Sequence, residues 1–282
     1  MRLVPFERSA GATARAGDGI ANGARNDADR TDVALLLHGF GADRLGWLAN
    51  APTLAGAARV LAPDLPGHGA SADLEPGGFD AVLGTVRAAV RELLDGRARA
   101  PARLHLVGHS LGGALAIALA ADDALPVASL VAVAPAGLGT GIDVAWLRAL
   151  VALEDEGAAL AHLGRLVADP RMVSRQAAGA LVAHLGRGGV REGLDALARD
   201  LDGLEARLGP AVAAVAARGV PRACVWGELD AVNPPDEARV AAFGGESVRL
   251  ERAGHLPHVE RAGPFNRLAL GLIGAARPSD GR

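Results

Sequence analysis

Short, almost wholly apolar runs recur along the chain, and most of them end in glycine, proline or a polar turn residue. An apolar run of about four to eight residues between turn signals is typical of a strand buried on both faces of a parallel sheet. Such runs predict strands at residues 33–37, 59–63, 104–107, 129–133, 222–226 and 247–250, with a short edge strand at 2–6.

Helical periods fill much of the space between these runs. Residues 80–95 place valine and leucine at helical spacing, and Gly96 follows as a stop signal. Further helices are predicted at the alanine-rich segment 114–121 and at 264–276. Strands that alternate with helices predict an α/β fold with a mostly parallel central sheet flanked by helices, built from residues 33–136 and 220–282.

Between residues 137 and 219 the strand pattern disappears. Helices are predicted at 143–153, 156–167, 174–185, 190–208 and 210–217, with breaks at Pro170 and at the pair Gly188 and Gly189. An all-helical block between two strands of an α/β domain predicts an inserted cap at 137–219. Among its apolar side chains, the candidates for facing a substrate are Trp146, Leu147 and Met172.

Composition narrows the functional classes. A formal net charge of -3 over 282 residues gives no electrostatic reason to expect a nucleic acid or an anionic membrane as partner. The single cysteine, Cys224, excludes an internal disulfide and is expected to be a buried, inert thiol. Residues 1–32, after the edge strand, read as a flexible arm, and their charged start does not resemble a signal peptide. The longest uncharged stretch contains Pro126 and Pro135, so it does not predict a membrane helix. We therefore expect a cytoplasmic protein that acts on a small molecule. The sequence leaves its oligomeric state open.

The segment 108–112 carries the clearest chemical signal, a G-x-S-x-G match placed between a strand and a helix. A strand that turns into a helix this sharply strains its central residue and leaves no room for side chains two positions away. Gly108 and Gly112 meet that demand, and Ser110 is then exposed at the sheet edge as a nucleophile. The amide of Leu111, at the helix N-terminus, is expected to form half of an oxyanion hole.

Loops after the first two strands of the core are expected to complete the surroundings of Ser110. The segment 38–41 follows a central strand, and the amide of Phe40 is the expected second oxyanion donor. The segment 64–71 contains Asp64 and His68, which are expected to shape the loop rather than to act in catalysis.

A serine nucleophile needs a base, and the base needs a third group that fixes its tautomer. In chains with such a serine turn between a strand and a helix, the catalytic residues follow in the order serine, acid, histidine, and the acid and the histidine each stand at the end of a later strand. Asp230 and His255 occupy those positions; Glu228 and Asp236 are weaker choices for the acid. His258 is expected to lie behind the site or at the surface. The pair of histidines at 255 and 258 lacks further ligands, so neither a metal nor another cofactor is expected.

These motifs together resemble the α/β-hydrolase fold over residues 33–275. The resemblance rests on the segments 38–41, 64–69, 108–113, 227–230 and 254–255. The run 134–139 and the start of the cap are similar to the hydrolase-like domain of the dihydrolipoamide acetyltransferase components of acetoin dehydrogenase systems. That family carries a lipoyl domain in front, whereas the first 32 residues here are too short for one and contain no lysine.

Four functions remain open on this basis. The expected one is a serine hydrolase that cleaves a small ester, thioester or related acyl bond through an acyl-serine. The alternatives are an acyltransferase with the same triad, a carbon–carbon bond hydrolase, and a non-catalytic binding protein on the same scaffold.

Overall fold

The computed structural model describes Met1 and residues 32–95 and 103–276. Its centre is a sheet of six strands in the order β2-β1-β3-β4-β5-β6, and every pairing in it is parallel. The strands are β1 (Val33–Leu37), β2 (Arg59–Leu61), β3 (Leu104–His109), β4 (Val127–Val133), β5 (Arg222–Gly227) and β6 (Glu246–Leu250). The predicted α/β fold is therefore confirmed; the expected edge strand at 2–6 and the arm after it lie outside the described residues.

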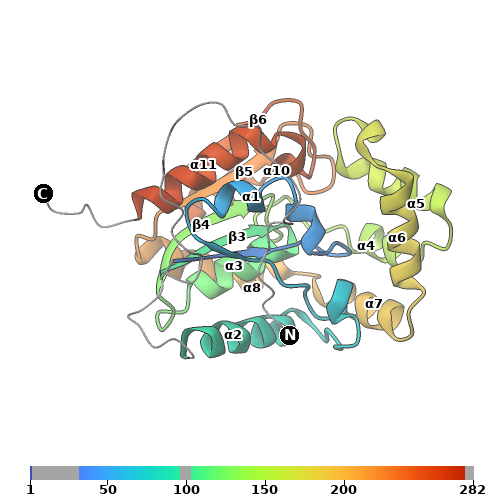
Figure 1. Ribbon diagram of the computed structural model, residues 1–282, viewed down its shortest axis with the longest axis horizontal. Coiled ribbons are helices and arrows are strands. Elements are labelled where there is room, and N and C mark those ends of the chain that lie inside the picture. Colours follow the sequence, from blue (N-terminus) through green and yellow to red (C-terminus); the bar gives the residue numbers. More distant parts are fainter. Residues whose placement is uncertain (2–31, 96–102, 277–282) are drawn as a thin grey trace, which may run out of the picture.

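Helices cover both faces of this sheet (Figure 1). Side chains of a strand alternate between its two faces, and β1 shows the result. Leu35 and Leu37 join one core cluster with helices on one face, whereas Ala34 and Leu36 join a second cluster on the other face. The first face carries α2 (Phe79–Asp95), α3 (Leu111–Ala120), α8 (Leu204–Ala217) and α9 (Glu237–Phe243); the second carries α1 (Ala51–Leu54) and α11 (Ala262–Ala275).

A group of helices stands at one end of the sheet, at the right of Figure 1. It has a hydrophobic cluster of its own. The group consists of α4 (Val144–Val151), α5 (Glu156–Leu163), α6 (Arg175–Leu185) and α7 (Val190–Asp200), with short 3-10 turns η4 (Gly164–Leu166) and η5 (Pro170–Met172). The division of the chain at 137 and 219 stays a prediction, and α8, which that division puts in the cap, has its buried side chains in the same cluster as α3.

One predicted helix boundary was wrong. The sequence predicted helices at 190–208 and 210–217, but the break falls at 201–203 and α8 begins at Leu204, with Pro210 inside it. Gly203 adopts a left-handed conformation with φ 66° just before α8, which ends one helix and begins the next. A glycine tolerates that conformation at little cost, so it determines the break.

Three further short elements connect the sheet to the site. They are η2 (Arg44–Trp47), η3 (Gly69–Ser71) and α10 (Pro257–Glu260). Loops that follow β1, β3, β4, β5 and β6 all open on the same end of the sheet, beneath the helices α4 to α7. Across the described residues, no helix is both long and apolar enough to cross a lipid bilayer.

Candidate active site

Ser110 sits at the turn between β3 and α3 with φ 52° and ψ -115°. A non-glycine residue in such a conformation costs about 1–3 kcal/mol, so the surrounding structure must impose it. A Cβ on Gly108 would lie 2.1 Å from the carbonyl oxygen of Gly112, and a Cβ on Gly112 would lie 2.2 Å from that of Leu37. Both glycines are thus required by the packing of the turn, as the motif predicted.

The turn places Ser110 in the wall of a cavity of about 640 Å³. Its backbone is fixed from two sides, because its amide donates to Val133 (2.9 Å) and its carbonyl accepts from Ala136 (3.0 Å). The predicted oxyanion residues, Phe40 and Leu111, line the same cavity. The Leu111 amide is at the first position of α3, where a helix provides no partner, and the Phe40 amide has no acceptor within the described ranges.

Two neutral histidines hold the loop that carries Phe40. His68 Nε2 accepts from the amide of Gly41 (3.1 Å), while its Nδ1 donates to the carbonyl of Pro66 (2.8 Å). His38 Nε2 accepts from the amide of Leu65 (2.9 Å). Burial lowers the pKa of both rings, that of His68 to about 3, so each keeps one nitrogen as an acceptor at neutral pH.

Asp64 ties the neighbouring loop together. Its carboxylate accepts from the amide of Arg44 (2.8 Å), from the Arg44 guanidinium (2.7 Å) and from the amide of Ala70 (2.9 Å). Together with the bonds of His68, this confirms that Asp64 and His68 shape the loop. Neither residue is a member of a nucleophile–base pair.

Asp230 and His255 form the hydrogen-bonded pair expected from their positions after β5 and β6. His255 Nδ1 lies 2.8 Å from Asp230 Oδ2, and both side chains are buried. Asp230 Oδ1 also accepts from the amides of Val232 (3.0 Å) and Asn233 (2.9 Å). Burial raises the pKa of Asp230, but attraction to His255 and these hydrogen bonds outweigh it and lower the pKa, so the carboxylate stays ionised.

The two loops that carry this pair are joined by their backbones. The amide of Leu229 donates to Ala253 (2.9 Å), and a Cβ on Gly227 would lie 2.1 Å from the Gly254 carbonyl oxygen. Ser110 and His255 line one cavity, so the structure brings the three predicted triad residues to one place. The role of each stays a prediction.

The helices α4 to α7 and the turns between them, called the cap region below, are attached to the His255 loop at two points. The amide of His255 donates to the carbonyl of Leu166 (2.7 Å). Glu260 bridges the same two segments: Oε1 accepts from the amide of Gly254 (2.8 Å) and Oε2 from that of Ala168 (2.7 Å). The position of the histidine loop therefore depends on the segment that contains η4.

Two histidines beside His255 escaped the sequence analysis in part. His109 was not singled out, yet its Nε2 donates to the His255 carbonyl oxygen (2.9 Å), and its ring lies 4.8 Å from that of His255. His258 is not at the surface: it is 3% exposed and its ring lies 4.7 Å from His109 and 4.5 Å from Trp47. Only the place of His109, directly before the nucleophile, hinted at this role.

The structure also locates the remaining residues that the sequence singled out. Trp146, Leu147 and Met172 all line the cavity. Cys224 is buried, and burial raises its pKa to about 12, which confirms an inert thiol. Asp236 caps α9, and Glu228 is exposed. No cluster of three potential metal ligands occurs in the part of the chain that the structure describes.

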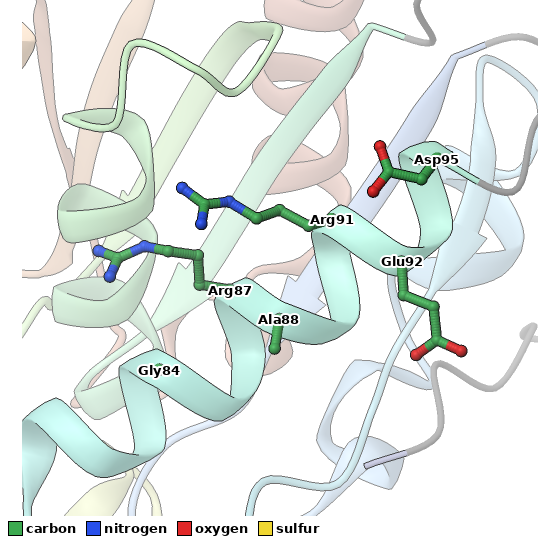
Figure 2. Close-up of a pocket in the computed structure, with 6 residues that line it drawn as sticks. All are labelled: Gly84, Arg87, Ala88, Arg91, Glu92 and Asp95. Atoms are coloured by element: carbon green, nitrogen blue, oxygen red, sulfur yellow. The ribbon is translucent and has the colours of Figure 1, made fainter.

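A second depression lies on the outer face of α2 (Figure 2). The described residues that line it are Gly84, Arg87, Ala88, Arg91, Glu92 and Asp95. The guanidinium groups of Arg87 and Arg91 pair with Asp122 at 3.2 and 3.1 Å, and these six residues include no nucleophile of the serine or cysteine type. The cavity around Ser110 is therefore the candidate site.

Known proteins are similar to this chain in sequence. A family model described as "Alpha/beta hydrolase family" matches residues 34–268. Two relatives, from Pseudomonas putida and Cupriavidus necator, are 36% and 33% identical over 247 and 237 residues. Each is named the dihydrolipoyllysine-residue acetyltransferase component of an acetoin cleaving system. The matches cover 85% and 84% of this chain but 62% of each relative, so the chain spans about three-fifths of their length.

A solved structure supports the same fold. The meta-cleavage product hydrolase from Pseudomonas fluorescens superimposes with a TM-score of 0.71 at 22% identity, covering 87% of this chain and 92% of that one. The family match, the parallel sheet and the strained serine between strand and helix agree with one another. The chain belongs to the α/β hydrolase family of enzymes.

Proposed function

We propose that this protein is a serine hydrolase that cleaves a small ester, thioester or related acyl bond through an acyl-serine intermediate. The observation that carries the proposal is the buried hydrogen bond between His255 and Asp230, 2.8 Å long, in the wall of the cavity that also holds Ser110. A histidine whose Nδ1–H is held by a carboxylate presents Nε2 as a base. The strained backbone of Ser110 is the feature that exposes a nucleophile to such a base.

The reaction would proceed in two halves. Ser110 attacks the substrate carbonyl while His255 takes its proton, and the oxyanion accepts hydrogen bonds from the amides of Phe40 and Leu111, each worth about 3 kcal/mol. The bond from the acyl carbon to the leaving group then breaks, acyl–oxygen in an ester or acyl–sulfur in a thioester, and His255 returns the proton to the leaving alcohol or thiol. Water attacks the acyl-serine, His255 takes the water proton, and Ser110 leaves with that proton as the free hydroxyl.

An acyltransferase with the same triad is the second candidate, because the two relatives are named as acetyltransferase components. A transferase differs in what reaches the acyl-serine second: it binds a thiol or alcohol acceptor and keeps water out. No arginine of the described residues lines the cavity to hold the phosphates of coenzyme A. We therefore favour water as the acceptor of the acyl group. The carbon–carbon bond hydrolase and the non-catalytic binding protein stay alternatives.

Product partitioning tests the proposal. The protein is given p-nitrophenyl acetate with rising concentrations of dihydrolipoamide or coenzyme A, and free acetate is measured against acyl-thiol. We expect acetate as the main product at every thiol concentration. A fluorophosphonate should add one adduct, on the peptide that contains Ser110, and Ser110→Ala should abolish both adduct and turnover.

Each contrary result has its own meaning. Saturable diversion of most of the acetyl group to dihydrolipoamide would replace the hydrolase by the transferase. A folded protein that neither forms the adduct nor turns over any ester would refute both and leave a binding protein. Turnover that survives in Ser110→Ala would show that the nucleophile is misassigned.

A further inference from the structure

The cavity around Ser110 is short of positive charge. No arginine is among the residues that line it in the described part of the chain, and the chain has no lysine. Its acidic lining residues are Asp43 and Asp143. Each caps a helical turn, Asp43 by accepting from the amide of Leu45 and Asp143 from that of Trp146, both at 2.8 Å. Both carboxylates are thereby held at the cavity wall.

Arginines that neighbour the lining residues in sequence are engaged elsewhere. Three of them form ion pairs with their own carboxylates: Arg44 with Asp64 at 2.7 Å, Arg171 with Asp169 at 2.7 Å and Arg175 with Glu156 at 3.0 Å. Arg165 stacks on the ring of Trp146, with its guanidinium carbon 5.8 Å from the ring centroid. None of these four guanidinium groups lines the cavity.

Three histidines of the cavity wall do not replace the missing cations. Burial lowers the pKa of His38, of His109 and of His258, the last to about 3, so these three rings are uncharged at neutral pH. His184, a fourth ring at the wall, has its Nε2 3.1 Å from the Gly67 carbonyl oxygen. His255 belongs to the proposed triad.

Three apolar side chains at the mouth of the cavity are exposed. Leu45, Leu48 and Met172 line the cavity and are nevertheless 53%, 56% and 50% exposed, so they reach from its wall to the solvent. Two of them belong to the segment of η2 and one to η5. Covering exposed apolar side chains with an apolar ligand removes their surface from water, which favours binding of that ligand.

We propose, on the basis of the serine hydrolase function above, that the substrates are uncharged esters or thioesters with an extended apolar chain, and that acyl compounds carrying a carboxylate or phosphate are rejected. An anion inside this cavity would lose its hydration, find no cation and face Asp43 and Asp143. A neutral chain would lose little hydration and would cover the apolar side chains at the mouth.

Three matched p-nitrophenyl esters test this. The first is the monoester of adipic acid with its ionised carboxylate, the second is the methyl ester of that compound, and the third is the heptanoate. We expect kcat/KM for the methyl ester and the heptanoate to exceed that for the carboxylate by at least about 100-fold. The same order is expected for their affinity to Ser110→Ala, followed by the fluorescence of Trp47 and Trp146, which line the cavity.

A charge placed at the mouth provides the complementary test. Met172→Arg should lower the preference for the methyl ester over the carboxylate by about tenfold or more, because it adds the missing cation. Leu74→Arg is the matched control: Leu74 is 40% exposed and does not line the cavity, so the same change in net charge should leave the preference as it was.

The outcomes separate the two proposals. Absence of turnover for all three esters refutes the hydrolase, while the binding order in Ser110→Ala still decides the charge preference. Equal kcat/KM and equal affinity for the carboxylate and its methyl ester would overturn the inference and leave the hydrolase standing. A preference for the carboxylate would overturn it as well.

Discussion

At the scale of single residues, Ser110, Asp230 and His255 should carry the chemistry, whereas the neighbouring His258 should not. Asp230→Asn and His255→Ala should each lower kcat by about 10⁴-fold, because the acid fixes the tautomer of the base and the triad acts as a unit. His258→Gln should lose less than about tenfold, since its ring contacts His109 and Trp47 instead of Asp230. Steady-state kinetics with circular dichroism as a folding control checks this; an inactive, folded His258→Gln would reassign the base.

Local sequence was sufficient for some of these residues and not for others. The glycines around Ser110 are needed by a turn of five residues, so the motif alone identified them. The order of Asp230 and His255 after successive strands was equally readable. The burial of His109 and His258 was not, because His109 meets the His255 loop 146 positions away and no local pattern records that contact.

At the scale of secondary-structure elements, Glu260 should position the His255 loop against the cap region. Glu260→Gln loses one of the two accepted hydrogen bonds and Glu260→Ala loses both, and a charge-assisted bond of this kind is worth about 1.5–3 kcal/mol. We expect kcat to fall in that order with a smaller change in KM. Glu237→Ala is the control, because its carboxylate pairs with Arg249 at the surface. Equal kcat in both Glu260 variants and the control would contradict the role.

Elements with a clear hydrophobic pattern were the ones the sequence predicted well. The strands are continuous apolar runs and α2 repeats apolar residues over several turns, and their predicted bounds differ little from the observed ones. The short α1, α9 and α10 were not predicted, since four to seven residues span two turns at most. The break at Gly203 between α7 and α8 was not predicted, because whether a glycine ends a helix depends on what packs around it.

At the scale of the whole molecule, buried neutral histidines should make the protein sensitive to mild acid. His38, His68, His109 and His258 all have their pKa lowered by burial. Below the ordinary value of 6.5 the unfolded chain binds protons that the folded chain does not, so stability falls as pH falls. Each histidine removes at most about 1.4 kcal/mol per pH unit, and the four together at most about 5.6 kcal/mol per pH unit.

Urea unfolding at several pH values between neutral and about pH 5 measures this slope. His258→Gln, which removes one of the four groups, should reduce the slope by about a quarter. The lowered pKa of Asp230 acts in a more acidic range, below its ordinary value of 3.8. A free energy of unfolding that stays constant from neutral pH to about pH 5 would rule out this account.

One hydrogen bond links the chemistry to the cap region. The amide of His255 donates to the carbonyl of Leu166, and that amide belongs to the proposed catalytic base itself. Its proton can exchange with deuterium only when this hydrogen bond opens. The exchange rate of this single amide therefore measures the free energy of separating the His255 loop from the segment at Leu166, in the resting protein and without any substrate.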